Sequence, residues 1–324
     1  MFKLVVTVGI IGYRNHAQRL ISLIDDDSRC KLKYIFHPNK KIDDDRATNN
    51  FSLLFECDVI IIASPNKTHY DYLEKLESFS GYIFCEKPPV INQNELNKLK
   101  ETININGKKL FFNFNYRFSG LNNIFKKYLK SEEIGDIVYI EIIASQGLAF
   151  KQNYSKSWRA DGVNNKFNLL DTVTIHYLDL MNYYFGTSKN QFYFPKMISK
   201  NGTSFDTGQL LLEYEKFNIS LINSYSTPFI GELLIIGTNG YISIRNEVLE
   251  VNTPRDTFDK NNFFISPPIS FTQKFNMQDD YKSSLKNSFN FFISHVVDNK
   301  EFDISLYETS LKTTQSILEL RSEL

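Results

Sequence analysis

The sequence predicts an α/β protein, with a parallel sheet in its N-terminal domain and a large, mostly antiparallel sheet in an α+β C-terminal domain. Over the first 118 residues, short apolar runs alternate with helical patterns, as in a parallel sheet covered on both faces. From residue 119 to residue 324, strand patterns separated by Gly, Asn and Thr turns dominate. A chain of 324 residues is long enough for two cores, because single cores usually stop growing at about 250 to 300 residues. We therefore predict two domains, 1–118 and 119–324, with the C-terminal helix packing back on the first.

Five apolar runs mark the strands of the first domain, and helical spacing marks the segments between them. The strands are expected at LVVTVGII (4–11), KLKYIF (31–36), DVIIIAS (58–64), YIFCE (82–86) and LFFNF (110–114). The helices are indicated by Ala17, Leu20, Ile21 and Ile24, by Leu73, Leu76 and Phe79, and by Leu96, Leu99 and Ile103. Since strand and helix alternate, the strands should run parallel.

The second domain begins with one amphipathic helix and continues mainly as strands. Leu121, Ile124, Phe125, Tyr128 and Leu129 form the apolar face of the helix. Six strands are expected, at DIVYIEIIAS (136–145), QFYFPKMIS (191–199), TGQLLLEYE (207–215), FNISLINSYS (217–226), GELLIIGT (231–238) and YISIRNEVLEV (241–251). A helix over about residues 169–185 interrupts them, and two helices, 281–297 and 305–324, close the chain.

Composition excludes several kinds of partner. Lys plus Arg and Asp plus Glu each count 37, so the formal charge is zero and no basic stripe indicates a nucleic-acid partner. No apolar run approaches the roughly 20 residues of a membrane span, and no cleavage site follows the apolar N-terminus, so we expect a cytoplasmic protein without membrane contact. The three cysteines and five histidines lack metal-ligand spacing, so neither a disulfide nor a metal site is expected.

The first predicted strand is followed by G12-Y-R-N-H-A17, which occupies the frame of the G-x-G-x-x-G/A fingerprint of Rossmann-type dinucleotide-binding domains. Gly12 would make the tight turn, Ala17 would let the helix pack closely on the strand, and the helix N-terminus would offer amides to a pyrophosphate. Arg14 stands where a glycine normally lets the backbone approach the phosphate. Alone, the motif fits a strand-turn-helix without a nucleotide about equally well.

Two further strands end in polar residues. In S64-P-N-K-T-H69, Asn66 would lie at the carboxyl edge of the sheet, where ligands bind in open α/β folds. The alternative is that Pro65 and Asn66 only form a turn and His69 only caps a helix. Glu86 and Lys87 end the next strand, and the two prolines that follow fix the backbone, which indicates a functional rather than a solvated charge pair.

Together with N115-Y-R-F118, S157-W-R159 and I175-H-Y-L-D179, these motifs resemble the Gfo/Idh/MocA family, the glucose-fructose oxidoreductase and inositol dehydrogenase relatives. The resemblance covers nearly the whole chain, including G-T-N-G-Y-I-S-I (237–244) and the final helix. It implies a Rossmann domain, a C-terminal sheet often used to form dimers or tetramers, and oxidation or reduction of a sugar-like carbinol with NAD or NADP.

The resemblance also implies where the cofactor binds. Gly12 and Ala17 would meet the pyrophosphate and Glu86 and Lys87 the nicotinamide side. Arg117, and with it Trp158 and Arg159, would line the cofactor and substrate cleft. The ribose region and its surroundings are assigned to the remaining residues, Ser64, Pro65, Asn66 and His69.

Lys87 and His176 are the candidates for chemistry. Removing hydride from a carbinol carbon requires that the hydroxyl proton also leave, so a nearby base must accept it. His176 is the candidate base, and the Lys87 ammonium would stabilise the developing alkoxide charge. Without the resemblance, His176 would be interpreted as a helix histidine hydrogen-bonded in an interface.

One departure from the family concerns the residues before His176. The family usually has Asp four residues earlier on the same helical face, and here that position is Thr172, which we include among the catalytic candidates. Asp171 lies five residues away, about 140° around a regular helix, and is expected to cap the helix N-terminus.

The residues after the second strand bear on the choice between NAD and NADP. An NAD site commonly has Asp or Glu there, which accepts hydrogen bonds from the ribose 2′-hydroxyl. Here His37 is followed by Lys40 and Lys41, with no carboxylate before Asp43. Lys40, Lys41 or Arg14 could contact a 2′-phosphate, so NADP is preferred over NAD. The alternative is a solvated basic turn.

The leading hypothesis is therefore a dehydrogenase or reductase acting on CH–OH groups of a sugar, amino sugar or nucleotide-sugar, as a homodimer or homotetramer. The rival is a non-catalytic dinucleotide-binding sensor of the same fold, favoured by Thr172 and Arg14 and disfavoured by Lys87 and His176. A lyase or hydrolase that uses the cofactor transiently is the third hypothesis.

Overall fold

A computed structural model describes residues 5–101, 108–129, 131–256 and 258–323. The chain forms two compact units. The first contains Met1–Asn115 and Leu285–Leu318, and the second contains Tyr116–Ser284 and Glu319–Leu324.

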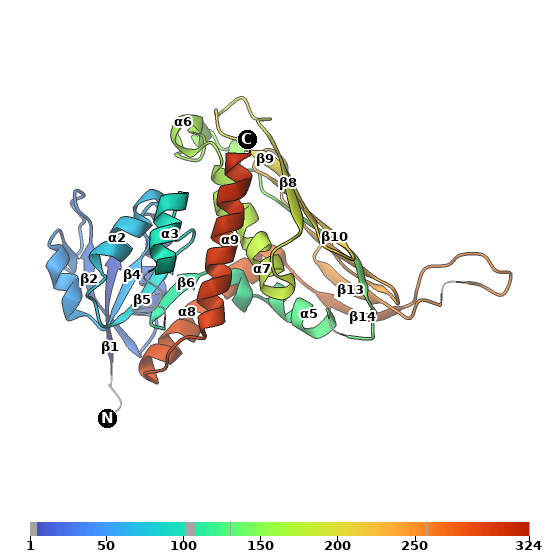
Figure 1. Ribbon diagram of the computed structural model, residues 1–324, viewed down its shortest axis with the longest axis horizontal. Coiled ribbons are helices and arrows are strands. Elements are labelled where there is room, and N and C mark those ends of the chain that lie inside the picture. Colours follow the sequence, from blue (N-terminus) through green and yellow to red (C-terminus); the bar gives the residue numbers. More distant parts are fainter. Residues whose placement is uncertain (1–4, 102–107, 130, 257, 324) are drawn as a thin grey trace. The chain divides into compact units, whose positions relative to one another are not determined.

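The first unit is built on a six-stranded parallel sheet (Figure 1). Its strands are β1 (Val6–Ile11), β2 (Cys30–Phe36), β3 (Ala47–Thr48), β4 (Val59–Ile62), β5 (Tyr82–Glu86) and β6 (Leu110–Asn113), in the order β3-β2-β1-β4-β5-β6. The chain order reverses between β1 and β4, and this switch point is where open α/β sheets bind ligands. All five predicted strands are present, and the two-residue β3 was not predicted.

Helices of the first unit lie where the apolar spacing predicted them. Helix α1 (Asn15–Asp25) buries Ala17, Leu20, Ile21 and Ile24. Helix α2 (His69–Lys75) buries Leu73, but the predicted helix residues Leu76 and Phe79 lie beyond its end, although both are buried. Helix α3 (Gln93–Glu101) buries Leu96 and Leu99, whereas Ile103 lies outside the described residues. A 3₁₀ turn, η1 (Phe51–Glu56), precedes β4.

The end of the chain returns to the first unit through α8 (Met277–Val297) and α9 (Ile304–Ser322). The ring of Phe292 in α8 packs on Phe111, with centroids 5.8 Å apart, and Tyr307 in α9 packs on Phe112 at 5.3 Å. Successive strand residues point to opposite faces, so these two helices contribute to different faces of the sheet.

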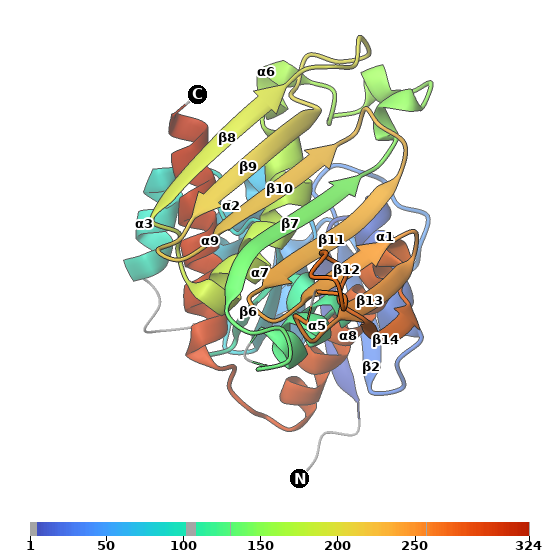
Figure 2. The ribbon, with the colours of Figure 1, turned by 90° about the vertical axis from the view of Figure 1, so that its right-hand side faces the viewer.

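The second unit is built on an eight-stranded sheet in the order β14-β13-β12-β11-β7-β10-β9-β8, seen face-on in Figure 2. The strands are β7 (Ile137–Ser145), β8 (Asn190–Lys196), β9 (Thr207–Glu213), β10 (Asn218–Ser224), β11 (Ile230–Gly237), β12 (Tyr241–Arg245), β13 (Val248–Asn252) and β14 (Ile269–Lys274). The β7–β10 pair is parallel and every other neighbouring pair in this sheet is antiparallel. The predicted mostly antiparallel sheet is confirmed.

Two details of this sheet differ from the prediction. The single strand expected over 241–251 is a hairpin, because Asn246 and Glu247 adopt positive φ angles of 50° and 62° and reverse the chain between β12 and β13. Strand β14 was not predicted. All six of its residues are exposed, so it lacks the buried alternation from which strands are recognised.

The helices of the second unit cover one face of the sheet. Helix α5 (Gly120–Tyr128) is capped by the Ser119 hydroxyl, and the Asp280 carboxylate accepts the N–H groups of Gly120 and Leu121. A short helix, α6 (Gly162–Asn165), and the 3₁₀ turns η4 (Leu148–Phe150) and η5 (Tyr154–Lys156) precede the long helix.

The helix expected over 169–185 has two parts, a π-helical segment η6 (Leu170–Thr174) and the α-helix α7 (Ile175–Phe185). Asp171 lies inside η6, and its N–H donates to the Phe167 carbonyl oxygen at 3.1 Å. The prediction that Asp171 caps the helix is therefore wrong, because the helical backbone begins before it.

In the ranges that the structure describes, we find no helix with the length and apolar character required to cross a membrane.

Candidate active site

The turn between β1 and α1 has the backbone of a phosphate cradle. Gly12 has φ +114°, and a Cβ atom there would lie 2.5 Å from the Ala63 carbonyl oxygen, so only glycine fits. Arg14 is the N-cap residue of α1, with an ordinary extended φ of −89°, so this position does not need glycine. Arg14 provides no side-chain cap, and the first turn of α1 holds no acidic residue. The N-terminal amides of α1 thus fit an anionic group such as a pyrophosphate.

A basic cluster lies beside this turn, at the end of β2. The Nδ1 atom of His37 accepts the Lys40 backbone N–H at 2.8 Å, and the Lys40 ammonium lies 5.0 Å from the centre of the Tyr13 ring. Burial, followed by the charges of Lys40 and Arg14, lowers the pKa of His37. At neutral pH His37 is therefore an uncharged hydrogen-bonding group, and the positive charge of this cluster comes from Lys40 and Arg14.

The turn after β4 is closed by its own side chains. In the 3₁₀ turn η2 (Asn66–Thr68), the Thr68 hydroxyl donates to the Pro65 carbonyl oxygen at 2.8 Å and lies at the same distance from the Ser64 hydroxyl. His69 follows and is fully buried, with its ring nitrogens 2.9 Å from the Ser64 carbonyl oxygen and 2.8 Å from that of Pro88. His69 is enclosed by backbone and leaves no exposed surface for the cofactor contact predicted for it.

Glu86, at the end of β5, is held by protein groups. Its Oε1 atom lies 2.7 Å from His16 Nε2 and accepts from Asn113 Nδ2 at 2.7 Å, and the Ser288 hydroxyl donates to Asn113 at 2.6 Å. Burial raises the pKa of Glu86, but His16 and Asn113 together hold it below its usual value. Glu86 is thus a buried anion held by His16 and Asn113, and its place on the nicotinamide side stays a prediction. Lys87 follows directly and is partly exposed.

His16 was missed by the sequence analysis. One signal was available, because His16 lies in the first turn of the helix that follows Gly12 and so near the carboxyl edge where Glu86 ends its strand.

His176 lies in the first turn of α7, in the second unit. It is 8% exposed, and its ring packs between Tyr116, with centroids 4.9 Å apart, and Tyr281, at 6.5 Å. The hydroxyl groups of Tyr116 and Tyr177 lie 3.2 Å apart, and burial raises the pKa of Tyr177 to about 12. Two aromatic rings therefore flank the imidazole of His176 and leave it mostly buried.

Arg117 and Asp179 form a buried ion pair next to this cluster. The guanidinium donates from Nε to Oδ2 at 2.7 Å and from Nη2 to Oδ1 at 2.5 Å, and the two side chains are 3% and 1% exposed. Such a bidentate pair fixes the helix that carries Asp179. The structure therefore pairs Arg117 with Asp179, and its place in the cofactor and substrate cleft stays a prediction.

Thr172 and Arg159 contribute to a second polar group in this unit. The Thr172 hydroxyl donates to the Asn168 carbonyl oxygen at 2.5 Å and lies 2.6 Å from the Tyr225 hydroxyl. The Arg159 side chain bonds to the same tyrosine and stacks on Trp158, which is 36% exposed, with 4.6 Å from its guanidinium carbon to the ring.

The π-helical segment changes the geometry assumed for Asp171. A π-helix closes i→i+5 hydrogen bonds, so the angle of 140° expected from a regular α-helix does not apply across Leu170–Thr174. The Asp171 carboxylate lies 3.6 Å from Arg321. Which of Thr172 and Asp171 serves His176 stays a prediction.

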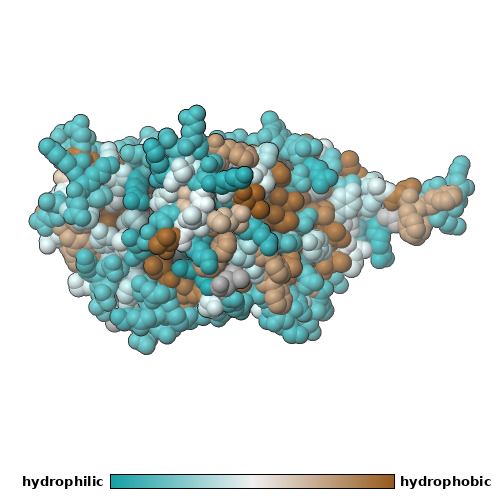
Figure 3. All heavy atoms as spheres, turned by 90° about the horizontal axis from the view of Figure 1, so that it is seen from above, coloured by the Kyte–Doolittle hydropathy of each residue, from teal (hydrophilic) through white to brown (hydrophobic). Residues whose placement is uncertain are grey.

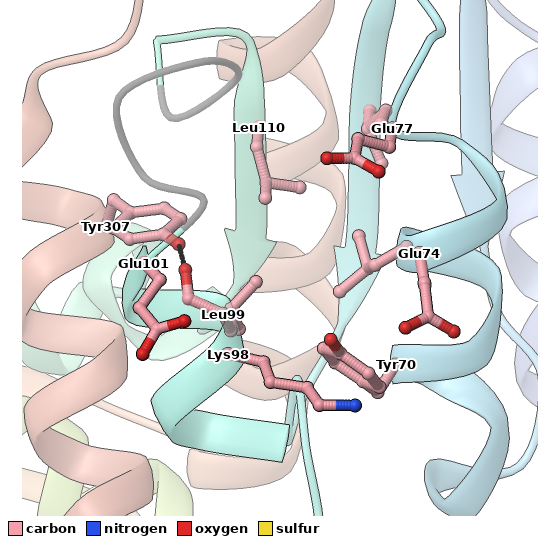
Figure 4. Close-up of a pocket in the computed structure, with 10 residues that line it drawn as sticks. Tyr70, Glu74, Glu77, Lys98, Leu99, Glu101, Leu110 and Tyr307 are labelled. Atoms are coloured by element: carbon pink, nitrogen blue, oxygen red, sulfur yellow. Dashed lines mark hydrogen bonds between the residues drawn. The ribbon is translucent and has the colours of Figure 1, made fainter. Parts of the chain in front are cut away.

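A separate hollow of about 270 Å³ in the first unit lies at the opposite edge of the parallel sheet (Figure 4). Ile83 and Leu110, near the amino ends of β5 and β6, line it together with Glu74, Glu77, Glu101 and Lys98. It contains none of the predicted site residues. Among the described residues, no group of three His, Cys, Asp or Glu side chains could hold a metal ion.

Comparisons with known proteins identify the family. Residues 6–114 match the family model described as an oxidoreductase family with an NAD-binding Rossmann fold, and residues 124–243 match the GFO/IDH/MocA C-terminal domain. Glucose-6-phosphate 3-dehydrogenase of Bacillus subtilis is 28% identical over 127 residues, which are 39% of this chain and 36% of that protein. D-glucoside 3-dehydrogenase of Escherichia coli is 28% identical over 153 residues, 46% of this chain and 39% of that protein. The matched regions thus span less than two fifths of either relative.

A solved structure extends the likeness in fold to the whole chain. An oxidoreductase from Agrobacterium radiobacter, in complex with NAD⁺, L-tartaric acid and magnesium, superposes with a TM-score of 0.79 at 18% identity and covers 98% of this chain and 96% of that one. With both domain models matched in order along one chain, the protein belongs to the GFO/IDH/MocA family of oxidoreductases.

Proposed function

We propose that this protein is an NAD(P)-dependent dehydrogenase or reductase that acts on a CH–OH group of a glucose-type sugar or sugar derivative. The observation that carries the proposal is the cradle at Gly12 and α1, in a family member that also has Lys87 and His176. The two relatives described above, a glucose-6-phosphate 3-dehydrogenase and a D-glucoside 3-dehydrogenase, favour a glucose-type substrate.

Each residue has a defined task in this proposal. The nicotinamide supplies the hydride acceptor when it is bound. His176 takes the hydroxyl proton, and its packing against Tyr116 and Tyr281 restricts the ring to one orientation. Lys87 stabilises negative charge on the substrate oxygen, and the buried Glu86 beside it contributes a fixed opposite charge.

The test is to purify the protein, measure bound cofactor and follow reduced-cofactor absorbance with glucose, glucose 6-phosphate, glucosides, amino sugars and nucleotide-sugars. Turnover of any of these supports the enzyme. Cofactor binding without turnover of any of them favours the sensor instead, and a protein that binds neither NAD nor NADP contradicts both.

We expect NADPH to bind at least tenfold tighter than NADH, because the charges of Arg14 and Lys40 both act on His37 after β2, and either could contact a 2′-phosphate bound there. No Asp or Glu follows β2 before Asp43 to accept the ribose 2′-hydroxyl and repel that phosphate. Nicotinamide fluorescence titrations of both cofactors measure the ratio.

The double variant Lys40→Glu with Lys41→Glu should weaken NADPH selectively, since it reverses charge near the phosphate and leaves the Gly12 turn unchanged. Lys33→Glu with Lys31→Glu, on the neighbouring strand β2, is the matched control. Tighter binding of NADH by the wild type, or equal weakening of both cofactors in the variant, would contradict the NADP preference.

The protein should be an oligomer that associates through the uncovered face of the eight-stranded sheet. Phe192 and Phe194 point outward from β8 and are 49% and 50% exposed, while their neighbour Tyr193 is buried. The projecting segment between β13 and β14 adds Phe263 and Phe264, 69% and 84% exposed, and apolar side chains are visible at that end of the molecule in Figure 3. Apolar surface of this extent commonly marks an interface.

Light scattering at micromolar concentration should give at least twice the chain mass of 37.8 kDa. The double variant Phe192→Ser with Phe194→Ser should lower the mass, whereas Val163→Ser, at an exposed apolar residue of α6, should not. A wild-type monomer would refute the interface.

A further inference from the structure

We infer that His69 is a positioning residue for the proposed reaction, because its ring bridges the two strand-end loops that carry the cofactor-site residues. The expected effect on the reaction rests on the proposed function. The contacts of the His69 ring are all within the first unit and do not depend on that function. The two contacts of the ring are called the His69 bridge below.

The bridge joins segments that are far apart along the chain. His69 begins α2, and one ring nitrogen lies 2.9 Å from the carbonyl oxygen of Ser64, five residues earlier. The other lies 2.8 Å from the carbonyl oxygen of Pro88, nineteen residues later. Ser64 ends the loop after β4, and Pro88 follows Lys87 in the loop after β5. One side chain thus sets the separation of these two loops.

The position of the ring leaves it no other task. His69 is 0% exposed, so it cannot contact substrate, cofactor or solvent without local unfolding. A buried polar ring is retained at such a place only if its hydrogen bonds are made. The hydroxyl of the neighbouring Thr68 donates to the Pro65 carbonyl oxygen, so the loop that contains Ser64 is bonded to the residue directly before His69.

The bridge also makes a demand on protonation. Both partners are carbonyl oxygens, which only accept, so two hydrogen bonds require an N–H on each ring nitrogen. Burial lowers the pKa of His69, and the positive charge of Lys87 lowers it further. The contacts with the two carbonyl oxygens and the Glu86 carboxylate raise it. Because the net effect is a lowered pKa, the ring is neutral at neutral pH, so it donates one N–H to one of the two carbonyl oxygens and its other nitrogen lies beside the second.

The consequence for the reaction concerns Lys87, the residue directly before Pro88. If the Pro88 carbonyl is released, the Lys87 ammonium loses its fixed distance from the loop of Ser64 and Asn66. A misplacement of about 1 Å in a reacting group can cost roughly a hundredfold in rate. Loss of the bridge should therefore reduce kcat more than it reduces stability.

The kinetic test compares His69→Phe, which keeps the ring volume and removes both contacts, with Leu73→Ala. Leu73 is buried one turn further along α2, so its truncation removes packing without touching either loop. We expect His69→Phe to lower kcat at saturating cofactor at least about tenfold. Leu73→Ala should lower the melting temperature at least as much as His69→Phe does, while its kcat stays within about twofold of the wild type. His69→Gln, which retains one donor, should recover part of the lost kcat. Equal kcat values in His69→Phe and Leu73→Ala would overturn the positioning role.

A second measurement needs neither cofactor nor substrate. In the protein labelled with ¹⁵N-histidine, a slowly exchanging ring N–H signal should be present at neutral pH and absent from His69→Gln, or from His69→Phe if that variant folds. The absence of any such protected ring N–H would overturn the bridge even if the enzyme is active. A protected signal in a protein that binds no cofactor would support the bridge while the proposed function fails, so the two failures are distinguishable.

Discussion

Replacing Lys87 by alanine should lower kcat at least about a hundredfold and leave the dissociation constant of NADPH within a few-fold. A preorganised cationic donor at an oxygen that gains negative charge contributes about 10²- to 10³-fold to rate, because it is worth more in the transition state than in the ground state. Lys87 follows the buried Glu86 and precedes Pro88, so its backbone is held on both sides. Initial rates under saturating cofactor, with fluorescence titration of NADPH, measure the two effects separately.

The control for this variant is Lys75→Ala, at another lysine of the same unit, on α2. It should retain full turnover. Lys87→Arg keeps the charge but changes the donor geometry, so we expect it to recover only part of the rate. Wild-type turnover in Lys87→Ala would remove Lys87 from the mechanism.

Replacing His176 by alanine should also reduce turnover at least about a hundredfold, the range typical of a general base. The hydroxyl proton must be accepted for hydride to leave, so the loss should appear in kcat at saturating cofactor. Initial rates of both proteins, with titration of the cofactor, measure it.

His295→Ala provides the comparison, because His295 is a histidine in α8 whose Nδ1 lies 2.9 Å from the Phe291 carbonyl oxygen. It should keep the wild-type turnover. If His176→Ala also kept it, another group would be the base.

The architecture was accessible from the sequence because its signals are local and repeated. In α1, the four residues chosen for their spacing are the four that the structure buries. Strands β4, β5 and β6 are short runs buried at every residue, as expected for strands covered on both faces. The glycine at position 12 could also be assigned, because only a residue without Cβ tolerates the positive φ and the nearby Ala63 carbonyl.

Contacts between distant side chains were not accessible in the same way. No pattern along the chain distinguishes a His69 that contacts a cofactor from one that bonds to the backbone of Ser64 and Pro88. The same holds for Arg117, whose partner Asp179 lies 62 residues away in the sequence. The hairpin at Asn246 and Glu247 was missed because a glutamate rarely adopts a positive φ, so no turn was expected there.

The π-helical turn before His176 has a consequence for how this chain is aligned with other proteins. A π turn encloses one more residue in each hydrogen-bonded ring than an α turn does, so it can absorb a single-residue insertion without displacing the helix on either side. A residue that lies before the inserted position can therefore correspond, in a relative whose helix is a regular α-helix, to a residue one position closer to the histidine. An alignment without a gap pairs Thr172 with the residue four positions before the relative's histidine. An alignment with one gap between Thr172 and Thr174 pairs Asp171 with that same residue instead. Residue identities in this helix should accordingly be compared by superposed coordinates and not by spacing.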